Sequence, residues 1–169
     1  MIALVPHPQA PGAAVRGVHA AAARAPGGRL ALRYRIEADL ERLRIPPPRA
    51  PAPGERLWQH LCCEAFVAPA AASAYREFNF SPSGEWAAYA FERYREGGPL
   101  AAPGTVRTAI PGSGALELAA SIAVERALLR VALCAVIEER DGTLSYWALR
   151  HPAARPDFHH PDGFALELA

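Results

Sequence analysis

The amino-acid sequence predicts an all-β protein, an antiparallel β-sandwich of jelly-roll or immunoglobulin-like type with about nine strands. The chain of 169 residues contains 17 prolines and 13 glycines, which divide it into short segments separated by turns. Several of these segments alternate apolar and polar residues, and no repeat of fixed period is present. Short alternating strands joined by turns are typical of sandwiches, and the chain length suits one domain spanning residues 1–169.

The segment 29–38 shows the alternation most clearly. Leu30, Leu32, Tyr34 and Ile36 occupy every second position, and the residues between them are mostly charged. Because neighbouring side chains of a strand point to opposite faces, this pattern predicts a strand with one buried face.

Two later segments, 115–125 and 129–139, are apolar enough to form strands that are buried on most of their surface. The second could be helical by composition alone. Its β-branched residues favour a strand, and an Asp141-Gly142 turn follows it. Asp-Gly is a common turn between antiparallel strands, so we expect a hairpin that continues into a strand at 143–149.

The segment 56–69 and the start of the segment 75–89 form a second candidate hairpin. Their alternation would place Cys62, Glu64 and Phe66 on one face of the first strand and the polar residues of the second strand on the same side. The opposite faces are mostly apolar and hold Cys63, Ala65 and Val67, then Ala74, Phe78 and Phe80. Tyr75, Glu77 and Asn79 therefore belong to the predicted polar face.

Glu64 and Glu77 would bring two like charges together if these strands pair. Such repulsion must be offset by an arginine, a cation, a hydrogen-bonding ligand or a raised pKa. Arg33 and Arg35 are candidates for simple neutralisation of the acids on a partly wet face. Two neighbouring carboxyl groups can also act as acid and base on a glycoside, which is a further interpretation of the same residues.

Aromatic residues are dense around this hairpin, which suits a core as well as a site. Trp86 follows a predicted Pro-Gly turn at 81–84, whereas Trp58 and Trp147 stand beside loops and polar residues. Flat rings can cover the apolar face of a sugar, while acids and amides bond its hydroxyl groups. The three tryptophans are therefore candidates for a stacking platform.

The C-terminal segment holds a second polar cluster that includes His159 and His160. Adjacent residues of an extended segment point to opposite sides, so these two histidines are poorly placed to bind one metal ion together. A zinc or haem site could be drawn with His60, Cys62 and Cys63, but no short metal-binding spacing is present. The alternative is that these residues cap a loop and bond the backbone.

Composition and missing motifs narrow the classes of function. The formal net charge is +1, which indicates no nucleic-acid partner and no attraction to anionic membranes. Phosphate-binding glycine loops and the nucleophile elbow of serine hydrolases are missing. No apolar run approaches the ~20 residues of a membrane span. The N-terminal segment lacks the features of a secretory signal. The three cysteines do not form a disulfide framework. We therefore expect a cytoplasmic protein.

The strings LWQHLCCEAF, YREFNFSPSGEWAAYAFERYREG, LSYWALRH and PDFHH together resemble the bacterial DOMON-like domains. These lie near the DOMON superfamily and the family 9 carbohydrate-binding modules. The resemblance covers the chain from about Leu30 to its C-terminus and implies a β-sandwich whose relatives bind sugars or haem. Haem-binding relatives use axial methionine and histidine ligands, and the single methionine of this sequence is Met1.

The function predicted from the sequence is a non-enzymatic module that binds a saccharide or a similar polar small molecule. No catalytic residue, metal ligand or cofactor is assigned, and the oligomeric state stays open. The alternatives are a haem- or metal-binding domain, a glycoside-processing enzyme and a protein-interaction module. The residues expected at the binding site are Trp58, Glu64, Tyr75, Glu77, Asn79, Trp86, Trp147, His159 and His160.

Overall fold

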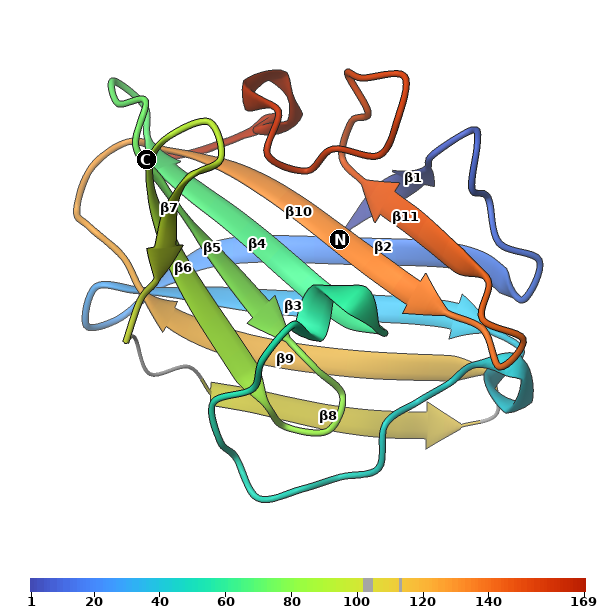
Figure 1. Cartoon of the computed structure of the whole chain (residues 1–169). Helices are drawn as coiled ribbons and strands as arrows, with labels where there is room; N and C mark the ends of the chain where they lie inside the picture. The colour runs from blue at the N-terminus through green and yellow to red at the C-terminus, as the bar shows by residue number, and fades with distance from the viewer. Residues whose placement is uncertain (102–104, 113) are drawn as a thin grey trace.

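The computed structural model describes residues 1–101, 105–112 and 114–169 (Figure 1). Two of the segments rich in proline and glycine that are predicted to form turns, 96–104 and 110–114, lie partly outside the described residues. Within the described part of the chain there are twelve strands and three short 3-10 helices. They are β1 (Ile2–Pro6), β2 (Val15–Ala25), β3 (Arg29–Ala38), η1 (Leu40–Arg42), η2 (Leu57–Gln59), β4 (Cys62–Pro69), β5 (Tyr75–Phe80), β6 (Trp86–Arg93), β7 (Glu96–Pro99), β8 (Thr105–Gly112), β9 (Ala115–Ala123), β10 (Leu129–Glu138), β11 (Leu144–Ala148), η3 (Pro161–Gly163) and β12 (Leu166–Leu168).

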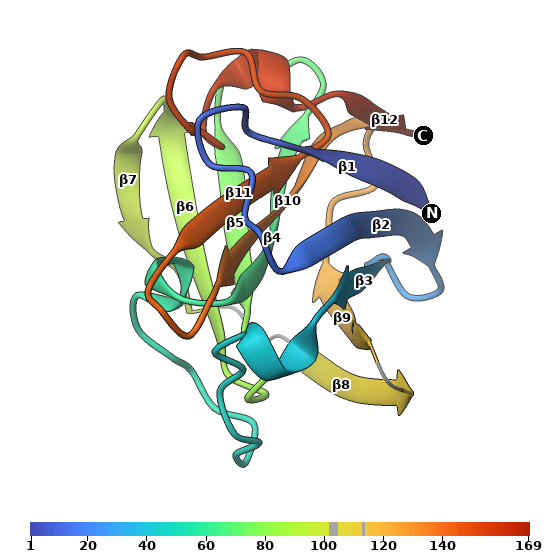
Figure 2. The same ribbon diagram turned by 90° about the vertical axis from the view of Figure 1, so that its right-hand side faces the viewer.

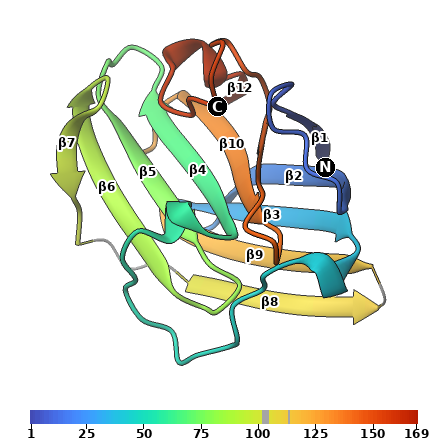
Figure 3. The same ribbon diagram turned by 45° about the vertical axis from the view of Figure 1, so that its right-hand side comes forward.

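The strands form two layers, which confirms the predicted antiparallel sandwich (Figure 2). We call the layer β2-β3-β9-β8 sheet A and the layer β7-β6-β5-β4-β10-β11 sheet B. The short strand β1 pairs with both β2 and β11 and so joins the two sheets along one edge. Strand β12 pairs with β10 beside the end of β11. Figure 3 shows sheet A crossing behind sheet B.

Several of the longer strands lie where the sequence predicts them, although β2, the longest, was not predicted. β3 spans 29–38, and β10 and β11 form the expected hairpin around Gly142, whose φ is +90°. The apolar segment 129–139 is a strand rather than a helix, because β10 pairs with β4 along one edge and with β11 and β12 along the other. The described strands outnumber the nine expected because β1, β7 and β12 have three to five residues each, too few to show alternation.

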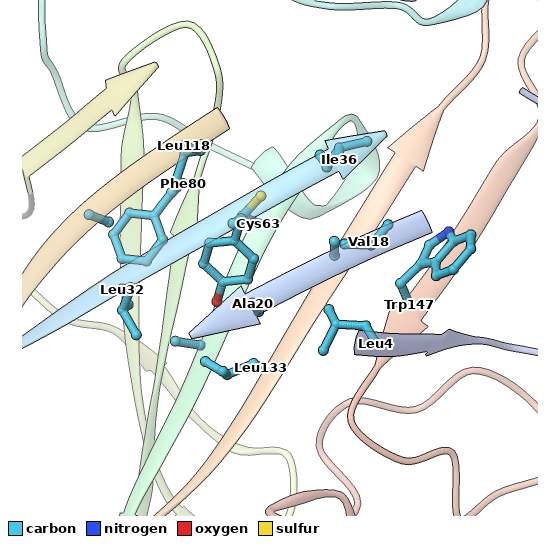
Figure 4. Packing of buried hydrophobic residues seen from close by; sticks show 14 of the residues in the cluster. Leu4, Val18, Ala20, Leu32, Ile36, Cys63, Phe80, Leu118, Leu133 and Trp147 are labelled. Atoms are coloured by element: carbon cyan, nitrogen blue, oxygen red, sulfur yellow. The ribbon is translucent and has the colours of Figure 1, made fainter. Parts of the chain in front are cut away.

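The main core fills the space between the two sheets. Sheet A contributes the apolar face of β3, and sheet B contributes the face of β4 and β5 that includes Cys63 and Phe80 (Figure 4). The predicted division of β4 and β5 into an inner apolar and an outer polar face is therefore confirmed. The outer face of sheet B consequently lies outside this core and is available for a second cluster of side chains.

One hydrogen bond crosses the core between the sheets. The buried hydroxyl of Tyr34 on β3 donates to the backbone carbonyl oxygen of Glu64 on β4 at 2.7 Å. A buried hydroxyl needs such an acceptor, because leaving it unpaired in an apolar core is costly. The contact also connects sheet A to the strand that carries Glu64.

Among the described residues, no helix has the length and apolar character needed to cross a membrane.

Replacing Tyr34 by Phe keeps the ring and removes this inter-sheet hydrogen bond. We expect the free energy of unfolding to fall by about 1 kcal/mol, the typical net worth of one hydrogen bond. Urea denaturation of both proteins measures the difference. Tyr94→Phe is the matched control, because it removes a tyrosine hydrogen bond to Asp157 at the exposed surface instead of in the core, and we expect a change below about 0.5 kcal/mol. Equal stability of Tyr34→Phe and the wild type would contradict a structural role for this contact.

Candidate ligand-binding cavity

A cavity of about 490 Å³ lies on the outer face of sheet B. Its floor comes from β4, β5, β6, β10 and β11, and it is bordered by η2 at one end and by residues 156–159 of the C-terminal segment at the other. Figure 1 shows η2 and the C-terminal segment at opposite ends of these strands. The cavity size falls in the usual range for small-molecule sites, roughly 300–1,000 Å³.

The alternation of β4 explains why carboxyl groups face this cavity. Cys63 and Ala65 point into the main core, so Glu64 and Phe66 must point outward. In the β4–β5 register, Glu64 pairs with Asn79 and Phe66 pairs with Glu77. The two glutamates are therefore diagonal neighbours, about 7–8 Å apart at their backbones, rather than directly opposite.

Glu64 is the most unusual residue of the cavity. It is 2% exposed, and its Oε1 atom has no hydrogen-bond partner among the described residues. Burial, with a smaller contribution from the negative charge of Glu77, raises the pKa of Glu64 well above its ordinary value. A buried carboxyl without partners favours its neutral, protonated form, in which Glu64 can donate a hydrogen bond.

Glu77 is better supported than Glu64. Asn79 Nδ2 donates to its Oε1 at 2.9 Å, and His159 Nε2 lies 3.6 Å from its Oε2. Burial raises the pKa of Glu77, while the Asn79 hydrogen bond and the charge of Arg95 act in the opposite direction. Two neighbouring carboxyl groups with different surroundings thus differ in how readily they ionise, and Glu77 is the one whose surroundings favour the negative charge more.

His159 connects the cavity to Tyr75. Its Nδ1 atom lies 2.8 Å from the Tyr75 hydroxyl, which also accepts the backbone N–H of Arg95 at 3.1 Å. The Tyr75 hydrogen is then free to be donated to Nδ1, and this leaves the proton of His159 on Nε2, the nitrogen that faces Glu77. Burial, with a smaller effect of Arg95, lowers the pKa of His159 to about 4, so the ring is neutral at neutral pH.

A charged cluster anchors the C-terminal segment beside the cavity. Arg95 Nη2 donates to Asp157 at 2.9 Å, and the Tyr94 hydroxyl donates to the same carboxylate at 2.7 Å. Asp157 also accepts the backbone N–H of His159 at 3.1 Å. This cluster positions His159. It also pairs the positive charge of Arg95 with the carboxylate of Asp157, which does not line the cavity.

Aromatic rings form much of the cavity wall. They come from η2, β4, β6, β11 and the C-terminal segment. Trp58 is 45% exposed and stands at the rim, where a flat ring can contact a ligand without first being uncovered. The aromatic lining residues are Trp58, Phe66, Tyr89, Phe91, Tyr146 and Phe158.

The structure brings four of the nine expected site residues to the cavity itself, namely Trp58, Glu64, Glu77 and His159. Tyr75 and Asn79 lie behind them and bond His159 and Glu77, respectively. Both belong to the same network but are not cavity-lining residues.

The other three expected residues lie elsewhere. Trp147 is 5% exposed within the main core and donates to Ser145, and Trp86 packs against the same core. Trp147 is buried and Trp86 is partly buried on the inner face of sheet B, so neither provides the expected stacking surface in this cavity. His160 accepts the backbone N–H of Asp162 at 3.3 Å and caps η3, as the loop-capping interpretation predicted.

The sequence reasoning missed Arg95, Tyr89 and Phe91 as members of this site. Tyr89 pairs with Glu77 and Phe91 with Tyr75 in the β5–β6 register. Continuing the alternation of β5 into the next hairpin strand would have found both rings. Arg95 has no comparable signal, because its φ of +57° places it in a tight turn that periodicity does not describe.

The side chains of His60, Cys62 and Cys63, considered above as possible metal or haem ligands, do not converge on one point. Cys62 and Cys63 point to opposite faces of β4, and His60 Nδ1 lies 2.8 Å from Glu138 instead. Within the described residues, no group of three or more histidine, cysteine or acidic side chains is arranged to hold a metal ion.

Comparison with known proteins shows what the chain resembles. No protein-family model matches the sequence, and no curated protein matches it. Among solved structures, the chain is similar to the crystal structure of a "putative carbohydrate-binding protein" from Bacteroides uniformis, with a TM-score of 0.70 and 17% sequence identity. The match covers 96% of this chain and 84% of that one. The two proteins share their fold.

Replacing Glu64 by Gln tests whether its carboxyl is buried and protonated. Because the folded state keeps the proton that the unfolded state loses above pH 4.5, wild-type stability should fall as pH rises from that value toward neutrality. The variant lacks this contribution. We therefore expect the difference in free energy of unfolding, wild type minus variant, to become more negative by up to about 1.4 kcal/mol per pH unit.

Urea denaturation at several pH values measures this difference. The titration of His159, whose pKa is lowered to about 4, affects the stability of both proteins equally. It therefore cancels in the difference between them. A difference that stays constant with pH would mean that Glu64 is ionised in the folded protein.

Proposed function

We propose that the chain is a non-enzymatic binding module that holds a saccharide, or a similar polar small molecule, in the cavity on the outer face of sheet B. The observation that carries this proposal is the combination of an exposed ring, Trp58, with a buried carboxyl, Glu64, on one cavity of suitable size. A sugar presents apolar C–H faces and hydroxyl groups, and this cavity offers a partner for each.

The polar groups suit a ligand with several hydroxyl groups. Protonated Glu64 can donate a hydrogen bond, Glu77 can accept, and Gln59 at the rim can do both. A buried oxygen without a hydrogen-bond partner, such as Glu64 Oε1, is costly to a folded protein. A ligand that bonds this oxygen removes that cost, so part of the binding free energy comes from satisfying a group that is already present.

The shared fold with a structure described as carbohydrate-binding supports the same class of ligand. The resemblance of the sequence to DOMON-like domains agrees with it, and we propose membership of that group as the finer assignment. Because one fold can carry many functions, the main support for saccharide binding is the cavity itself.

A glycoside-processing enzyme is a second candidate, because both glutamates line one cavity. Acid–base catalysis requires two carboxyl groups on either side of a scissile bond. Incubation of the protein with oligosaccharides, followed by chromatography of the products, separates the two functions. A binding module leaves the oligosaccharides intact, and cleavage that is lost in Glu77→Gln would establish the enzyme.

Replacing Trp58 by Ala removes the exposed ring at the rim. We expect at least about tenfold weaker saccharide binding, equivalent to about 1.4 kcal/mol, with little change in melting temperature because the side chain is half exposed. Trp58→Phe keeps a ring and should retain most of the affinity. A thermal-shift screen of mono- and oligosaccharides finds the ligand, and isothermal titration calorimetry measures the loss.

Leu128→Ala is the matched control, since Leu128 is 48% exposed and lies outside the cavity. Unchanged saccharide affinity in Trp58→Ala would remove the ring from the site. Failure of every saccharide to raise the melting temperature would contradict the proposed function.

A further inference from the structure

The cavity contains a buried hydrogen-bond acceptor that the described residues leave without a donor. Glu64 is 2% exposed and lines the cavity, yet its Oε1 atom has no hydrogen-bond partner among the described residues. Asn79 on β5, which pairs with Glu64 and lies behind the cavity wall, also has a buried oxygen, Oδ1, without a partner there. Natural proteins rarely leave buried polar atoms unpaired, so a group that donates hydrogen bonds, from water or from a ligand, is expected beside this oxygen.

The charges around the cavity are also unbalanced. Glu64, Glu77 and Asp157 are acidic, and Arg95 is the basic residue that contacts this network. Arg95 is bound to Asp157 at 2.9 Å, and that pair is neutral in sum. His159 is neutral because its pKa is lowered to about 4. With Glu77 ionised, the network carries one negative charge when Glu64 is protonated and two when Glu64 is ionised.

The walls suit a positive charge as well as a sugar ring. Aromatic faces attract cations, and the attraction grows when the site is shielded from water. Six aromatic residues surround the two glutamates in this cavity. Hydrogen bonds between an ammonium group and a carboxylate are roughly twice as strong as those between neutral groups. A neutral sugar would use the rings but would leave the charge imbalance in place.

We propose that the ligand is a saccharide with a free amino group, an amino sugar whose ammonium lies between Glu64 and Glu77. The inference rests on the proposed function, since it names the class of saccharide for the same site. The ammonium donates to the unpaired Glu64 oxygen and to Glu77, while the ring carbons contact the aromatic wall. Glu64 gives up its proton to solvent as the ammonium binds, so the carboxylate formed is balanced by the arriving charge.

Proton release depends on the groups that surround Glu64. The neighbouring thiols and phenols stay neutral, since burial raises the pKa of each. The titratable and charged groups near Glu64 are Cys62 and Cys63 on β4, Cys134 on β10, Glu77 on β5, Tyr34 on β3, Tyr89 on β6, Tyr146 on β11, and His159 with the Arg95–Asp157 pair. Glu64 is thus the group expected to lose a proton when the ammonium binds.

Three disaccharides with the same glycosidic linkage test the proposal. Cellobiose carries a hydroxyl group beside each anomeric carbon, the chitosan disaccharide carries an ammonium there, and the chitin disaccharide carries an acetamide. Isothermal titration calorimetry of the full chain, at a pH where the sugar amine is charged, measures all three. We expect the chitosan disaccharide to bind at least about tenfold more tightly than the other two.

Two further measurements identify the role of Glu64. Titration in buffers with different heats of protonation should show about one proton released on binding the chitosan disaccharide. Glu64→Gln should lose the preference for the charged disaccharide and most of the proton release. Glu125→Gln, which changes an exposed residue outside this cavity, should keep both. The wild-type proton count tests the proposal even if the Glu64 variant folds poorly.

The outcomes separate this inference from the proposed function. Binding of cellobiose as tight as that of the chitosan disaccharide would overturn the amino-sugar inference and leave saccharide binding intact. Equal binding of ethylamine and the chitosan disaccharide would mean that the sugar contributes nothing, which contradicts both. Absence of binding by all three disaccharides would overturn the amino-sugar inference, and the wider saccharide screen then decides the proposed function.

Discussion

The two-residue alternation of β4 is the constraint on which both the core and the cavity depend. Cys63 and Ala65 must pack against sheet A, so Glu64 and Phe66 are forced to the outer face of sheet B. The hydrogen bond from Tyr34 to the carbonyl oxygen of Glu64 holds the same strand position from the opposite side. A shift of one residue would move the carboxyl into the core, and packing between the sheets therefore determines where the acid lies.

A buried carboxyl such as that of Glu64 is costly to a folded protein, and the rest of the cavity is arranged around it. Asn79 and the His159 ring support Glu77, and the Arg95–Asp157 pair anchors the C-terminal segment that carries His159. The neighbouring acid thus has partners that Glu64 lacks. Groups that are buried, unpaired and of altered pKa occur preferentially at functional sites, and this difference between two adjacent glutamates is why we place the site here.

Local sequence pattern predicted the parts of the site that lie on regular strands. The outward direction of Glu64 and Glu77 followed from alternation, and their diagonal relation came only with the β4–β5 register. The inward direction of Trp86 and Trp147 could not be predicted, because it depends on which face of each strand meets the other sheet. The return of His159 over β5 depends on a loop that has no period, so sequence reasoning identified the residue but not its neighbours.

The central claim is that the Glu64 carboxyl is buried and protonated in the ligand-free protein. A carbon-13 NMR titration of the side-chain carboxyl groups tests it most directly, with the Glu64 signal assigned by its loss in Glu64→Gln. We predict that this carboxyl titrates well above its ordinary value of 4.5. Titration at or below that value would show a solvated or ion-paired carboxylate, and would contradict the description of the cavity on which both proposals rest.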